Sequence, residues 1–176
     1  NNTILSIPRD FSKMKSLRHL NISGNRFHGK LPVLKNSPHL EVLIADQNQL
    51  DGQIPNYNHM TELQILDLSR NKLTGNLNGI GNLELVQDLN LSENNLSGGI
   101  TLLKGYNFLI HLNLSNNHFE GPIPDLNGKS GLIDVDLSKN NLSGNLPDID
   151  GLTQLVDFNL SENRLAGQFR WPVNVP

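Results

Sequence analysis

The chain has 176 residues, a formal net charge of −3 and no cysteine. This length suits one domain or one short repeat array. The negative charge argues against nucleic-acid binding, and the missing cysteines exclude disulfides and thiolate-bound metal. No apolar run approaches the roughly 20 residues of a membrane-spanning helix, so we expect no membrane contact by this segment itself.

Charge is unevenly distributed along the chain. Residues 1–40 hold seven Lys or Arg against one acid, and residues 41–176 hold seven against sixteen. Such asymmetry either steers a partner or belongs to a solvated surface. The first residue is Asn rather than Met and no signal peptide is seen, so we expect a processed or cropped piece with further repeats or domains in the full chain.

Self-similarity at a fixed period is the main signal. An asparagine recurs every 23 residues, and a glycine follows four residues after each one. The asparagines are Asn25, Asn48, Asn71, Asn94, Asn117, Asn140 and Asn163. Leucines or other apolar residues hold the same phase upstream. We therefore predict a partial repeat at 1–16, seven 23-residue repeats at 17–168, and a partial repeat or cap around Trp171 at 169–176.

One repeat, read from Leu109, begins as a short strand. Leu112 and Leu114 alternate with polar residues, so the leucines are predicted to point inward and the polar residues outward. Neighbouring repeats then stack as a parallel sheet, because one strand cannot bury its apolar side alone. The asparagine at 117 follows, and its donor and acceptor can satisfy buried turn groups as part of a ladder. Gly121 permits an unusual φ, and Pro124 starts an extended return segment.

The segment LNLSNNHFEGPIP at 112–124 resembles the plant-specific class of leucine-rich repeats. That class occurs in ectodomains of receptor-like kinases and receptor-like proteins and in polygalacturonase-inhibiting proteins. The resemblance covers nearly the whole chain. It implies a repeat solenoid, a right-handed curved superhelix with a concave parallel β-sheet, few regular helices and a second extended strand in each repeat. It also implies binding of peptides, small hormones or proteins.

Two departures from that pattern stand out. The plant repeat usually has 24 residues, whereas these have 23. The second repeat carries Ala45 where the others carry an inward leucine or another large apolar residue, which leaves room or marks a local irregularity.

Outward strand positions form columns that run from repeat to repeat, and these predict the binding face. Column one is His19, Val42, Ile65, Asp88, His111, Asp134 and Asp157. Column two is Asn21, Ile44, Asp67, Asn90, Asn113, Asp136 and Asn159. Column three is Ser23, Asp46, Ser69, Ser92, Ser115, Ser138 and Ser161. An edge column follows at Gly24, Gln47, Arg70, Glu93, Asn116, Lys139 and Glu162.

Three neighbouring outward positions are apolar. Val42, Ile44 and Ile65 are expected to form one patch on adjacent strands, either as a ligand contact or as ordinary β-branched residues of a strand. We centre the predicted ligand-binding surface on this patch. Its candidate residues are His19, Val42, Ile44, Ile65, Asp67, Arg70, Asp88, His111, Asp134 and Asp157.

Enzyme and metal chemistry find little support. Asp134 and Asp136 stand about 7 Å apart, a spacing within the inverting-glycosidase range, but an open sheet offers no water-excluding cleft. The acidic cluster with Asp157 is therefore a solvated face or a contact for a basic partner. His19 and His111 lie roughly 19 Å apart at strand spacing, too far to share a metal. We expect no catalytic residue, no metal and no cofactor.

Seven Asn-x-Ser/Thr sequons occur, although the repeat consensus itself writes Asn-Leu-Ser. They are Asn1, Asn21, Asn90, Asn95, Asn113, Asn141 and Asn159. The leading hypothesis is a non-enzymatic binding module of a receptor-like ectodomain, extracellular or at the cell surface, with a protein or peptide ligand. The alternative is an intracellular or organellar scaffold subunit of a larger assembly.

Overall fold

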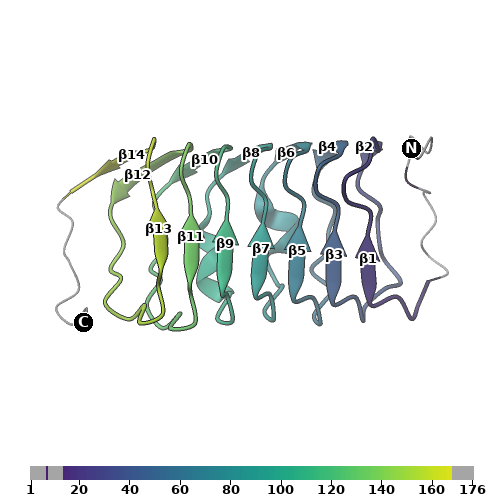
Figure 1. Ribbon diagram of the computed structural model, residues 1–176, viewed down its shortest axis with the longest axis horizontal. Coiled ribbons are helices and arrows are strands. Elements are labelled where there is room, and N and C mark those ends of the chain that lie inside the picture. The colour runs from purple at the N-terminus through teal and green to yellow at the C-terminus, as the bar shows by residue number, and fades with distance from the viewer. Residues whose placement is uncertain (1–6, 8–13, 168–176) are drawn as a thin grey trace.

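The computed structural model describes residue 7 and residues 14–167, and it shows two parallel seven-stranded sheets that run the length of an elongated array (Figure 1). The first sheet holds β1 (His19–Asn21), β3 (Val42–Ile44), β5 (Ile65–Asp67), β7 (Asp88–Asn90), β9 (His111–Asn113), β11 (Asp134–Asp136) and β13 (Asp157–Asn159). The second holds β2 (His28–Lys30), β4 (Gln49–Gln53), β6 (Lys72–Gly75), β8 (Asn95–Gly98), β10 (His118–Gly121), β12 (Asn141–Asn145) and β14 (Arg164–Ala166).

Strand pairing confirms the repeat. His19 pairs with Val42, Val42 with Ile65 and Ile65 with Asp88, so the register advances by one 23-residue repeat at each step. The predicted solenoid with a second strand in each repeat is therefore present. Helix is limited to two 3-10 turns in the described part, η1 (Leu77–Ile80) and η2 (Thr101–Gly105). Residues 1–6, 8–13 and 168–176, including Trp171, lie outside the described residues.

The core is a stack of apolar layers between the two sheets. Leu112 and Leu114 are 1% and 0% exposed, as the alternation predicts. Ala45 is also fully buried, so the small residue of the second repeat occupies the same inward position as the leucines. None of the described helices is long and apolar enough to cross a bilayer.

The asparagine ladder closes every strand turn. Asn94 Nδ2 donates to the carbonyls of Leu91 and Ser92 in its own repeat, at 3.2 Å each, and to Leu68 O in the preceding repeat at 3.0 Å. Its Oδ1 accepts the backbone N–H of Leu73, also in the preceding repeat, at 3.0 Å. The same four contacts recur at Asn48, Asn71, Asn117, Asn140 and Asn163. Each of these asparagines therefore bonds backbone groups of two neighbouring repeats.

Each turn also contains left-handed backbone at two places. The glycine four residues after each ladder asparagine has a positive φ, for example 78° at Gly121, as the sequence predicts. The residue directly before each ladder asparagine is left-handed too, with φ 54° at Glu93. The conformation costs a non-glycine residue about 1 kcal/mol or more. Every edge-column residue adopts it, so this column belongs to the turn and not to an extended strand.

One core position carries a charged residue. Lys129 is 2% exposed and occupies the position filled by Met60, Leu83 and Tyr106 in the three preceding repeats. Its Nζ donates to Tyr106 O at 2.8 Å and to Lys104 O at 3.1 Å, next to the end of η2. Burial lowers the pKa of Lys129, because the charged amine loses water. The lysine therefore satisfies carbonyls that the short helix leaves without partners.

The ladder generates a stability prediction. Asn94→Ala leaves the buried Leu73 N–H without its acceptor and removes one of two donors to the Leu68 carbonyl, which keeps Asn71 Nδ2 at 3.1 Å. We expect a loss of roughly 1–3 kcal/mol in the free energy of unfolding. Urea denaturation monitored by circular dichroism measures this change. Asn95→Ala, one residue away and exposed on β8, is the matched control. Equal denaturation midpoints for Asn94→Ala and the parent would show that the ladder does not satisfy the turns.

Candidate functional site

Two consecutive side chains face outward at the start of each first-sheet strand. The backbone N–H groups of Ile110 and His111 both donate to Gln87 O, at 2.8 and 3.1 Å. The same doubled contact occurs at each of the six repeat-to-repeat steps from β1 to β13. Two residues thus oppose one, as in a β-bulge, and strict alternation is broken there. Strand alternation does not predict the further outward column that directly precedes column one. We name it the leading column; its residues are Arg18, Glu41, Gln64, Gln87, Ile110, Ile133 and Val156.

Column two mostly serves the turns. Asn113 Oδ1 accepts the backbone N–H of Ser115 at 3.0 Å and its hydroxyl at 2.7 Å. The backbone contact recurs from Asn21, Asp67, Asn90, Asp136 and Asn159 to the serine two residues later. These side chains form Asx-turns that compete with any ligand for the same oxygen.

Column three is less open than the sequence analysis expects. Ser69, Ser92 and Ser138 are only 5–6% exposed, so these serines are not available as ligand contacts. Strand alternation predicts that they point outward. The strands end two residues earlier, however, so the serines lie in the turn and are buried there. The free polar surface of the sheet is therefore concentrated in column one and the leading column.

The second repeat departs from this arrangement. Ile44 replaces the Asn or Asp of column two, and Asp46 replaces the serine of column three. Ile44 has no oxygen to accept the backbone N–H two residues later, whereas Asp46 carries a carboxylate beside its own backbone N–H. Ile44 is consequently the one column-two residue without a turn function among the seven, all of which are described.

The predicted apolar patch is assembled in the structure. Val42 and Ile65 are direct partners on β3 and β5, and Ile44 follows two residues after Val42 on the same face. All three side chains are half-buried. Together they form an apolar surface that is partly exposed to solvent.

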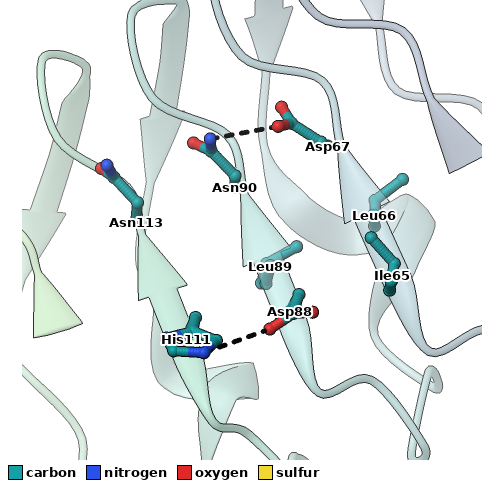
Figure 2. A pocket seen from close by; sticks show the side chains of 8 residues that line it. All are labelled: Ile65, Leu66, Asp67, Asp88, Leu89, Asn90, His111 and Asn113. Atoms are coloured by element: carbon teal, nitrogen blue, oxygen red, sulfur yellow. Dashed lines mark hydrogen bonds and ion pairs between the residues drawn. The ribbon is translucent and has the colours of Figure 1, made fainter. Parts of the chain in front are cut away.

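A shallow depression of about 340 Å³ borders this patch at Ile65 and crosses β5, β7 and β9 (Figure 2). It is lined by Ile65, Leu66, Asp67, Asp88, Leu89, Asn90, His111 and Asn113. Four of these residues, Ile65, Asp67, Asp88 and His111, are among the candidates predicted from the sequence. The depression has an apolar wall on the side of β5 and a polar wall on the side of β9.

A histidine links three strands beside the depression. His111 Nδ1 is 2.7 Å from Asp134 Oδ2, and His111 Nε2 is 3.9 Å from Asp88 Oδ1. That Asp88 oxygen is enclosed and accepts no hydrogen bond from the described residues. Asp67 Oδ2 accepts from Asn90 Nδ2 at 3.2 Å, as Figure 2 also shows. Asp88 Oδ1 therefore lacks a donor and is closed off from solvent, although the Asp88 side chain as a whole is 40% exposed.

Two charged residues lie close to the patch, Asp46 after β3 and Arg70 after β5. Burial raises the pKa of Asp46, and the neighbouring Asp67 carboxylate adds to this effect. Arg70 Nε donates to Glu93 Oε1 at 2.9 Å, and this contact raises the pKa of the Arg70 guanidinium. Arg70 is thus already paired, and a ligand carboxylate would compete with Glu93 for it.

The other sequence-predicted residues lie at the ends of the array. His19 is on β1, where its Nε2 is 3.4 Å from Glu41 Oε2. Asp157 is on β13, paired with Asp134 of β11. His19 and Asp157 are therefore on the first and last strands of the sheet and do not share a site with the depression. Within the described chain, no group of three His, Asp or Glu side chains is arranged to hold a metal ion.

Known proteins share this architecture. The profile described as Leucine Rich Repeat matches residues 16–36, 62–83 and 108–129. The plant peptide hormone receptor RGFR1, solved with RGF2, is 35% identical, with a TM-score of 0.86 over 91% of this chain and 27% of that one. The Arabidopsis receptor kinase HAESA, solved with the peptide hormone IDA and the co-receptor SERK1, is 32% identical, with a TM-score of 0.79 over 86% and 27%.

A third structure covers more of its own length. The ectodomain of the receptor kinase SOBIR1 from Arabidopsis thaliana is 36% identical, with a TM-score of 0.64 over 68% of this chain and 67% of that one. No curated protein sequence matches the chain. The fold and these matches define a leucine-rich-repeat solenoid. The chain belongs to the plant-type leucine-rich-repeat family, and it spans about a quarter of the length of the two hormone receptors.

The raised pKa of Asp46 generates a pH prediction. Because the folded-state pKa of Asp46 is raised, the folded state binds more protons than the unfolded state between the ordinary value of 3.8 and the raised value, so stability falls as pH rises through that window. Asp46→Asn removes the charge and should therefore be more stable than the parent at pH 7, with a difference that shrinks as pH falls below 3.8. Urea titrations at pH 7 and pH 3 measure it.

The matched control is Asp51→Asn, an exposed carboxylate on β4. It should leave the urea midpoint unchanged at both pH values. A variant Asp46→Asn that is less stable than the parent at pH 7 would mean that the carboxylate's contact with its own backbone outweighs its burial.

Proposed function

We propose that the chain is a ligand-binding part of a receptor-like ectodomain, and that it recognises a peptide or protein on the first sheet across β3, β5, β7 and β9. The observation that carries this proposal is Ile44. Six other repeats use column two for a turn acceptor, whereas the second repeat has an apolar side chain there, with no oxygen to accept a turn hydrogen bond. Stability of the turn alone does not require this exchange.

The surface suits an extended ligand with one apolar anchor. Val42, Ile44 and Ile65 form a low apolar centre, and the depression continues from Ile65 toward Asp88. Interfaces typically combine an apolar centre with a polar rim, and a few central residues dominate the binding energy. The Asp88 carboxylate, whose side chain is 40% exposed, would accept a hydrogen bond from a ligand amide or amine.

The relatives support a binding role. RGFR1 and HAESA were solved with peptide hormones. Their structures align with 91% and 86% of this chain, with TM-scores of 0.86 and 0.79. SOBIR1 is likewise represented by its ectodomain. A cell-surface location and a protein or peptide ligand follow from this kinship as part of the proposal. Catalysis has no place in it, since the face is an open sheet rather than a cleft.

Restoring the common pattern of the repeat tests the face. The double change Ile44→Asp with Asp46→Ser gives the second repeat the residues of the third, Asp67 and Ser69, so the Asx-turn should form and the fold should persist. Peptides selected from a random display library on the parent chain should bind this variant about 30-fold more weakly, equivalent to about 2 kcal/mol. Fluorescence anisotropy with the labelled peptides measures the affinity.

The control is Asp134→Asn with Asp157→Asn, which removes charge from β11 and β13 without touching the patch. It should leave the affinity of the selected peptides unchanged. Peptides that bind the second-repeat variant normally but fail on this control would put the site in repeats six and seven and contradict the proposal.

Glycosylation gives a separate test of the location. Asn95 lies exposed on β8 and Asn141 lies on β12, both in the second sheet and away from the proposed face. Asn90 and Asn113 lie on the first sheet, where their Oδ1 atoms are held in Asx-turns and Asn90 Nδ2 donates to Asp67. In plant secretory cells we therefore expect glycans at Asn95 and Asn141 before the face sites Asn21, Asn90, Asn113 and Asn159.

Glycopeptide mapping by mass spectrometry measures the occupancy; Asn1, also a sequon, lies outside the described residues. Full occupancy of Asn90 and Asn113 would cover the depression and remove that region from the binding surface. If the chain is produced through the secretory pathway and no sequon carries a glycan, the alternative of an intracellular scaffold is favoured instead.

A further inference from the structure

A second apolar surface lies along the margin of the first sheet, away from Val42 and Ile44. Phe108 is 57% exposed and Leu85 is 41% exposed, and the two occupy equivalent positions in consecutive repeats. Each directly precedes the buried residue that begins its repeat, Val86 or Leu109. Since Val86 and Leu109 already fill the core, the exposed residues are not needed there.

The leading column continues this surface. Ile133 N donates to Ile110 O at 2.9 Å, and Val156 N donates to Ile133 O at 2.8 Å, so the three side chains stand on successive repeats. Ile110 and Ile133 are half-buried, and Val156, on the last described repeat, is 75% exposed. We name these residues the apolar edge: Leu85, Phe108, Ile110, Ile133 and Val156.

Earlier repeats are polar at the same positions. The leading column holds Arg18, Glu41, Gln64 and Gln87 before it becomes apolar at Ile110. The positions equivalent to Leu85 and Phe108 hold His39 and Glu62, which contact each other at 2.6 Å. The fold therefore accepts polar residues throughout, and the change to apolar residues is confined to the second half of the array. An apolar surface of this kind marks an interaction site.

The charges beside the apolar edge restrict its partner. Asp134 and Asp157 directly follow Ile133 and Val156, and Asp136 lies on the same strand as Asp134. His111 on the same face contacts Asp134. A second copy docked on the same edge would bring these carboxylates together, which disfavours self-association. A partner with Lys or Arg beside its apolar residues is complementary.

The spacing of the edge restricts the partner's shape. Adjacent strands lie about 4.7–4.9 Å apart, so successive side chains of the leading column recur at about that distance along the array. Side chains three or four residues apart on an α-helix recur at about 5–6 Å. Alternate residues of an extended peptide recur at about 6.8 Å, a poorer match.

We propose that the apolar edge of repeats four to seven docks an amphipathic α-helix of a partner protein, laid along the array with its apolar stripe on Phe108, Ile110 and Ile133 and with flanking Lys or Arg toward Asp134 and Asp157. This site is separate from the face proposed above. It stands whether or not the face binds a ligand.

The test uses the 176-residue chain and synthetic peptides of leucine, alanine and arginine. In the helical probe the leucines follow a spacing of three and four residues, and in a control of identical composition they alternate. We expect saturable binding of the helical probe by fluorescence anisotropy, with amide shifts in ¹⁵N spectra at residues 85–88, 108–111 and 133–134. The alternating peptide and a helical peptide with glutamate in place of arginine should bind at least about tenfold more weakly.

The decisive variant is Phe108→Gln with Ile110→Gln, which places at these positions the residue type found at Gln154 and Gln87. It should keep the parent's urea midpoint and weaken the helical probe by about tenfold or more. Ile44→Asp with Asp46→Ser should bind the probe as the parent does, which separates this site from the face. The proposal is overturned by equal affinity of the Gln variant, by equal affinity of the glutamate peptide, or by self-association in sedimentation that the Gln variant abolishes.

Discussion

The asparagine ladder is the interaction on which the rest of the structure depends. Each turn buries backbone groups that water cannot reach, and one side chain with a donor and an acceptor satisfies groups in two repeats at once. Asn94 contacts Leu91 and Ser92 within its repeat and Leu68 and Leu73 in the one before. The ladder therefore sets both the shape of a turn and the stacking of its neighbours, and the apolar layers are held in register by it.

This constraint decides which outward positions are available for function. Column two and the edge column are occupied by turn chemistry, as Asn113 and the left-handed Glu93 illustrate. The side chains of column one and of the leading column have no role in the turns. They also vary most in chemistry, from Val42 to Asp88 in column one and from Arg18 to Ile133 in the leading column. Ile44 belongs to the free set because it has no side-chain oxygen that could accept a turn hydrogen bond. Both proposed surfaces are built from these free positions.

The sequence predicts the repeat, the core leucines and the ladder, since each follows from a residue type at a fixed interval. It also brings Ile65, Asp67, Asp88 and His111 together, because column membership implies adjacency. It does not reveal the leading column, because strand alternation assigns Ile110 no outward place and the doubled contact to Gln87 O is a backbone feature without a residue signature. The burial of Ser92 is missed for a similar reason, since the turn begins before the alternation ends.

The ladder also has a direction along the chain. The Leu73 N–H relies on Asn94 of the following repeat, whereas Asn94 keeps its bonds to Leu91 and Ser92 when the preceding repeat is absent. Within the ladder, detaching a repeat from the C-terminal side thus leaves a backbone donor without its acceptor, while detaching one from the N-terminal side frees only a side chain. The backbone hydrogen bonds between repeats run in both directions, since Ile110 N and His111 N donate to the preceding repeat and Leu91 N donates to the following one. Only the side-chain part of the contact between repeats is therefore directional, and through it each repeat depends on its successor.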